Sequence, residues 1–179
     1  IDASGNVFVG RTSDSTNVAG ISLLSSGKGV FNRDGNNALS VNRGSNDGAL
    51  VEFKRAGTTK GSISISGSTT SYNTSSDYRL KENIVDLANS ITRIKQLQPR
   101  RFNFTADAET TVDGFIAHET QTVVPEAVTG THNEVDDDGN PVMQGIDQSK
   151  LVPLLTAALK EAIAKIETLE TKVAALEAG

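Results

Sequence analysis

The sequence predicts an all-β N-terminal part followed by an α+β part that ends in a long coiled-coil helix. Residues 1–75 contain 11 of the 16 glycines together with 21 serines or threonines. They carry seven basic and five acidic residues, whereas residues 76–179 carry ten basic and seventeen acidic ones. Apolar residues recur at heptad spacing only near the C-terminus. These three observations place a domain boundary at residues 75 and 76 and separate two fold classes.

The N-terminal part alternates short apolar and polar segments with Gly, Asn and Asp, and it lacks both proline and helical periodicity. This pattern is typical of strands separated by turns. It predicts strands over 6–9, 38–41, 49–53 and 62–66. They are too short and too polar for a convincing isolated monomer, so we expect association of several chains to bury their apolar faces. A flexible Gly/Ser linker remains the alternative.

Residues 76–147 are expected to form the helix–strand core of the second part. Asp86 opens a segment whose apolar residues share one helical face, and Pro99 ends it. The pattern then predicts, in order, a strand over 101–104, a loop over 107–111, a strand over 114–117 and a hairpin over 134–143.

One long helix is expected over residues 148–178. Its apolar residues follow a heptad repeat with charged neighbours, as in a coiled coil. Packing of the helix on its own domain is the alternative, and Pro153 has to lie in the first turn. The predicted seam consists of Leu155, Leu159, Ala162, Ile166, Leu169, Val173 and Leu176.

Composition excludes several function classes. The chain has no cysteine, so it has neither disulfides nor a thiolate metal site. Its net charge of −5 gives no electrostatic reason to bind nucleic acid or an acidic membrane, and no apolar run is long enough to span one. The acidic run over 134–140 does not follow a calcium loop, because Gly145 stands where a bidentate Glu is required. We expect no cofactor and no metal. With 36% hydrophobic and 4% aromatic residues, a monomeric core would be thin, which favours oligomers.

Ser76 and Lys81 form a candidate nucleophile–base pair. A serine hydroxyl attacks efficiently only when a base takes its proton, and a lysine is such a base only when neutral. The reference pKa of lysine, about 10.4, is roughly three units above neutrality, so burial or nearby positive charge such as Arg79 is needed. A Ser five residues from a Lys is commonplace, so without further context an ordinary solvated loop is the better explanation of these two residues.

The context is a set of four ordered blocks. They begin at Ser76, Leu97, Gly114 and Ser149 and read SDYRLKENI, LQPRRF, GFIAHE followed by VPEAV, and SKLVPLL. They resemble the C-terminal chaperone domain of phage endosialidases, tailspikes and long tail fibres, a domain classed as a serine peptidase because it releases itself. His118 replaces the commoner Gln, and Gln148 stands where Tyr is usual.

This resemblance implies a parallel homotrimer in which residues 1–75 form a β-rich fibre stem and residues 76–179 form its intramolecular chaperone. Ser76 would be the nucleophile and Lys81 the general base, and the bond between Ser75 and Ser76 would break once per chain, with no external substrate. Asp77 would support the site by holding Lys81 or Arg79 or by capping a turn. His118 and Glu119 are further supporting candidates.

The same resemblance implies a place in the phage tail, with assembly in the bacterial cytoplasm and a released chaperone that is absent from the mature virion. The expected partners are the other two copies and the stem as folding client. Two rival functions remain. One is a trimerisation module that does not cleave, and the other is a fibre tip that binds a host surface glycan or receptor through residues 1–75.

Overall fold

The computed structural model describes residues 1–15 and 18–178, and the chain divides into two compact units. Unit 1 is Ile1–Glu82 and unit 2 is Asn83–Gly179. In the part of the chain that is described, no helix is both long and apolar enough to cross a membrane.

Unit 1 begins with a small antiparallel sheet in the order β1 (Val7–Val9), β2 (Gly20–Leu23) and β3 (Gly29–Asn32). The side chain of Arg11 is 1% exposed and donates hydrogen bonds to the carbonyls of Ser15, Val18 and Val30. Because one guanidinium satisfies three carbonyls, it ties the connection between β1 and β2 to the sheet.

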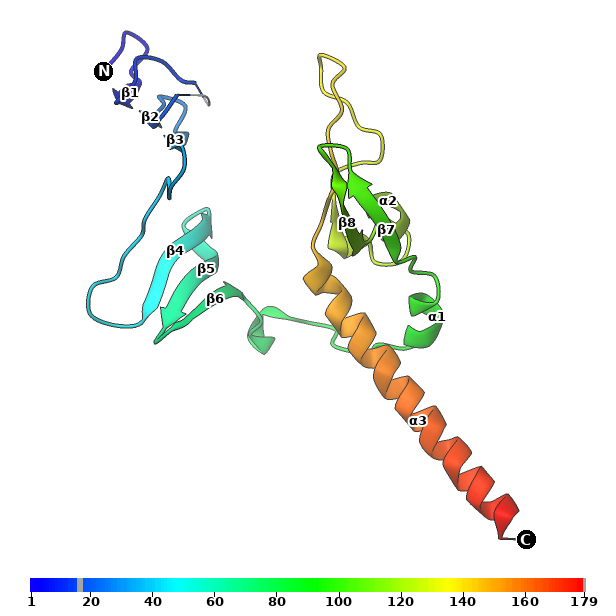
Figure 1. Ribbon diagram of the computed structural model, residues 1–179. Coiled ribbons are helices and arrows are strands. Elements are labelled where there is room, and N and C mark those ends of the chain that lie inside the picture. Colours follow the sequence, from blue (N-terminus) through cyan, green and yellow to red (C-terminus); the bar gives the residue numbers. More distant parts are fainter. Residues whose placement is uncertain (16–17, 179) are drawn as a thin grey trace. The chain divides into compact units, whose positions relative to one another are not determined.

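The second sheet of unit 1 is an antiparallel meander of β4 (Gly48–Arg55), β5 (Thr58–Ser66) and β6 (Thr69–Thr74), which Figure 1 shows in cyan and blue-green. Ala56 and Gly57 both have positive φ, as a two-residue hairpin turn requires. Strands predicted over 49–53 and 62–66 are confirmed. The strand predicted over 38–41 is wrong: these residues join no ladder, and alternation alone does not supply a hydrogen-bonding partner.

This meander has no hydrophobic core of its own. Every residue from Leu23 to Asn89 is exposed or only half-buried. Three strands can hold their register through backbone hydrogen bonds, but burial of apolar surface supplies most of the stabilisation of a sheet.

Unit 2 combines short strands and helices with one long helix. Its elements are α1 (Ser90–Ile94), β7 (Arg100–Phe104), β8 (Asp107–Gly114), α2 (Ala117–Gln121), β9 (Val128–Thr129), β10 (Gly145–Ile146) and α3 (Val152–Glu177). Short 3-10 turns lie at Pro125–Ala127 and Gln148–Leu151. Strands β7 and β8 form a hairpin, and β9 pairs with β10.

The core of unit 2 lies where the start of α3 meets the turns that follow α2. Its buried members are Val123, Val124, Ala127, Leu151 and Leu154. The first turns of α3 are therefore anchored in this core. A carboxylate oxygen of Glu161, two turns further along α3, accepts a hydrogen bond from the Ile91 amide at the start of α1 (3.2 Å). This contact satisfies an amide that the short helix leaves free and fixes α1 against α3.

The long helix predicted over 148–178 is confirmed as a 3-10 turn that continues into α3, with Pro153 in the first turn. Beyond its contact with α1 at Glu161, α3 runs clear of the other elements of its unit (Figure 1). Six members of the predicted seam are exposed and Ala162 is half-buried. The stripe thus has no intramolecular cover along most of its length.

Three predicted elements of unit 2 require correction. The helix expected from Asp86 begins only at Ser90, because Asn89 has a left-handed conformation (φ 57°, ψ 30°) that a helix cannot include. The loop expected over 107–111 is the first part of β8, and the strand expected over 114–117 contributes only Gly114 to that strand. The β-branched residues Thr110, Thr111 and Val112 favour an extended chain against β7.

Candidate functional site

The side chains of Ser76 and Lys81 are in direct contact. The Lys81 Nζ donates a hydrogen bond to the Ser76 Oγ at 2.8 Å. A 3-10 turn over Tyr78–Leu80 lies between them. Two backbone hydrogen bonds close it: the Leu80 amide donates to the Asp77 carbonyl (3.1 Å), and the Lys81 amide donates to the Tyr78 carbonyl (3.0 Å). One such turn reverses the chain enough for residues five apart to meet.

Asp77 caps this turn. Its side chain accepts a hydrogen bond from the Arg79 amide (2.9 Å) and two from the Arg79 guanidinium (2.9 and 2.7 Å). The Arg79 hydrogen bonds hold the pKa of Asp77 below its ordinary value, with a smaller contribution from attraction to Lys81. Asp77 was expected to hold Lys81 or Arg79, or to cap a turn. In the structure it contacts Arg79 and caps the turn, and it interacts with Lys81 only at longer range.

The Ser76–Lys81 contact lies at the surface of unit 1, and both residues are exposed. The hydrogen bond runs from the ammonium to the hydroxyl, so its direction must reverse before Lys81 can take the Ser76 proton. Removing water from around a lysine disfavours its charged form and so favours the neutral base that the reaction requires. A covering surface would therefore complete the chemistry.

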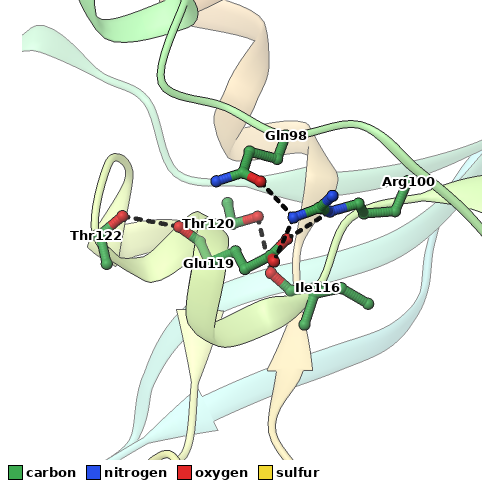
Figure 2. Close-up of polar contacts among 6 residues, drawn as sticks. All are labelled: Gln98, Arg100, Ile116, Glu119, Thr120 and Thr122. Atoms are coloured by element: carbon green, nitrogen blue, oxygen red, sulfur yellow. Dashed lines mark hydrogen bonds and ion pairs between the residues drawn. The ribbon is translucent and has the colours of Figure 1, made fainter.

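His118 and Glu119 lie in α2 of unit 2, and both have local partners. The imidazole of His118 stacks on that of His132, with ring centroids 4.1 Å apart and planes within 2°. Glu119 accepts two hydrogen bonds from the Arg100 guanidinium (3.0 and 2.7 Å), as Figure 2 shows. A role for these two residues in supporting Ser76 stays a prediction.

Short hydrogen bonds fix the ends of α2 and so position Glu119. The buried Thr120 hydroxyl donates to the Ile116 carbonyl (3.1 Å), and the Thr122 hydroxyl donates to the Glu119 carbonyl (2.8 Å) (Figure 2). Arg100 also donates to the side-chain oxygen of Gln98. Sequence reasoning missed Arg100, whose only signal was its position directly after Pro99 in one of the four blocks.

The Arg100–Glu119 pair leads to a pH-dependent prediction. The hydrogen bonds from Arg100 hold the pKa of Glu119 below its ordinary value. A carboxylate whose pKa is lowered by folding stabilises the fold above its unfolded pKa, about 4.3, and this contribution is lost as pH falls through the folded pKa. Arg100→Met should therefore lower the melting temperature at pH 7, and the difference from wild type should shrink toward pH 3.

Arg101→Met is the matched control, because Arg101 pairs with Asp113 in the next position and both side chains are about two-thirds exposed or more. Such exposed pairs contribute little. Thermal melts that show equal losses for both variants, or a loss for Arg100→Met that does not change with pH, would contradict the assignment.

No metal centre accompanies these contacts within the described ranges, where no three His, Asp or Glu side chains are grouped to hold an ion. Residues 76–129 match the model of a peptidase family described as the chaperone of endosialidase. The match begins at Ser76 and includes Lys81, His118 and Glu119. No curated protein matches the chain.

Proposed function

We propose, from the premise that residues 76–129 belong to the family of endosialidase chaperones, that residues 76–179 are a trimeric intramolecular chaperone which cuts its own chain between Ser75 and Ser76. The family supports a chaperone role, a peptidase domain and an association with phage tails. Residues 1–75 would then be the end of the stem of a tail fibre or tailspike, with assembly in the bacterial cytoplasm.

The observation that carries the proposal is the 2.8 Å contact between Lys81 Nζ and Ser76 Oγ at the first residue of the family match. A nucleophile and its base have to be within hydrogen-bonding reach, about 2.6–3.2 Å. The capped turn between these two residues, which are five positions apart, holds the two groups at that distance.

The proposed reaction is an acyl shift followed by hydrolysis. Neutral Lys81 takes the proton of the Ser76 hydroxyl while Oγ attacks the carbonyl carbon of Ser75. The C–N bond between Ser75 and Ser76 breaks as the leaving nitrogen receives a proton from the Lys81 ammonium. The result is an ester between the Ser75 acyl group and Ser76 Oγ, and water then cleaves it to a Ser75 carboxylate and a free Ser76.

The exposed stripe on α3 supports parallel self-association. Leu159, Ile166 and Val173 share one core position of the heptad. Lys165 and Lys172 each directly precede a residue at that position, and Glu170 and Glu177 each directly follow a residue at the other core position. In a parallel, in-register coiled coil, Lys165 of one copy lies beside Glu170 of another, and Lys172 lies beside Glu177. An antiparallel pair would bring lysines together instead.

The number of copies rests on the family resemblance, which implies three. Val, Leu and Ile at one core position with mostly Leu at the other also suit a coiled coil of two helices. A C-terminal coiled coil raises the effective concentration of the stem segments and aligns them, which shortens a search among many similar registers. Removing the coiled coil after assembly leaves no easy reverse path.

Intact-mass measurement of the wild-type chain after expression tests the proposal. The expected products are fragments of 75 and 104 residues, since the chain has 179. A wild-type chain that stays intact and sediments as an oligomer would instead establish a trimerisation module that does not cleave.

A further inference from the structure

We propose that the apolar face of the sheet β4–β5–β6 is a contact surface between copies of this chain. This stem face consists of Val51, Phe53, Ile63, Ile65 and Tyr72. The inference deepens the proposed function and rests on it, because it identifies the surface through which the folding client associates.

The strand register separates the two faces of the sheet. Ile63 lies opposite Val51 on one side and Tyr72 on the other, so the three side chains point to the same face. Ile65 and Phe53 share this face by the two-residue alternation of their strands. One side of the meander therefore carries its large apolar side chains together.

The opposite face is polar and already satisfied within the chain. The Asn73 side-chain amide donates to the Ser64 hydroxyl at 2.7 Å and lies 3.4 Å from that of Ser62. Such a ladder of small polar side chains suits contact with water. A sheet with one polar and one apolar face normally packs the apolar face against a core.

In a single chain the stem face is open. Tyr72 is 81% exposed and Phe53 is 55% exposed, while Val51, Ile63 and Ile65 are half-buried. Since an aromatic side chain can bury 150–250 Å², the face offers roughly 400 Å² per copy. Apolar patches of this size are often functional, yet a stable interface needs about 800 Å² per partner. The stem face therefore needs a second interface beside it.

The α3 stripe supplies that second interface and points to an identical copy as the occupant. Parallel, in-register association of α3 brings the same residues of every copy to the same level. Like surfaces can then meet only if they lack like charges. The stem-face residues of β5 and β6, including Gly61, Thr70 and Thr74, are uncharged, and the charged residue on the same face of β4 is Arg55 at the hairpin end of the strand. The apolar centre of the face, away from Arg55, is thus complementary to itself.

Single cysteines test the contact cleanly because the chain has none. Ile63→Cys places a thiol at the centre of the stem face, and Ser64→Cys, the next residue on the same strand, places one on the polar face. The full-length variants are treated with a short bismaleimide and separated on a denaturing gel. We expect covalent dimers from Ile63→Cys and at least tenfold fewer from Ser64→Cys.

Equal cross-linking of the two variants, or none in either, would overturn the contact. Light scattering on the same samples gives the molar mass of the oligomer, and the gel shows the fraction of chains that has been cut. A chain that is oligomeric and cut but does not cross-link at residue 63 refutes the stem face alone. A chain that cross-links at residue 63 and stays uncut refutes self-cleavage alone.

Discussion

Replacing Ser76 with alanine is expected to leave the whole chain uncut, and Lys81→Met is expected to do the same. Ser76 supplies the only oxygen that can attack the Ser75 carbonyl in the proposed acyl shift, and Lys81 Nζ, 2.8 Å away, takes its proton. Removing a member of such a pair slows the reaction by at least about a thousandfold. A time course of intact masses measures the loss directly.

Ser75→Ala is the matched control for this pair of variants. The mechanism uses only the carbonyl of residue 75, so the variant should be cut at the wild-type rate. Added hydroxylamine should capture the Ser75 acyl group as a hydroxamate in the wild-type chain, because it attacks esters much faster than amides. Cleavage of Ser76→Ala at the same bond would remove Ser76 as the nucleophile.

The second large effect is expected in the α3 stripe. Changing Ile166 and Leu169 together to Asp should convert the oligomer to a monomer. Their side chains are 53% and 59% exposed in one copy and are proposed to be buried between copies. Burying unpaired carboxylates there would cost several kcal/mol per copy, more than such an interface can offset. Sedimentation velocity distinguishes the two states.

The control for the α3 variant carries the same charges on the outer side of the helix. Ala164 and Thr171 lie on that side, so Ala164→Asp with Thr171→Asp should leave the oligomer intact. Circular dichroism should show that both double variants keep their helix, because the core anchors only its first turns. If both variants dissociate, charge rather than position is responsible, and the seam assignment is wrong.

Long periodic features of this chain were predictable from the sequence, and features set by distant partners were not. The helix over 148–178 and the strands around Leu50 and Ile63 carry their own periodicity over several residues. The strand β6 (Thr69–Thr74) was missed, because its threonines and serines look like loop residues until β5 pairs with them. The strand predicted over 38–41 was wrong for the converse reason: it has the pattern but no partner.

The contacts of the candidate site divide in the same way. Ser76, Asp77 and Lys81 lie within one turn, so their proximity follows from local geometry. The pairing of Glu119 with Arg100 depends on the β7–β8 hairpin, which returns the chain to α2. No local sequence pattern predicts this contact. The stacking of His118 on His132 depends in a similar way on the turn that follows β9.

The absence of any buried residue between Leu23 and Asn89 has a thermodynamic consequence. If the apolar side chains of the stem are buried only against neighbouring copies, unfolding of the stem also requires the copies to dissociate. The midpoint of its thermal transition should then rise with protein concentration, whereas that of a self-contained domain would not. The stability of this region then depends on the concentration of the protein and cannot be assigned to a single chain.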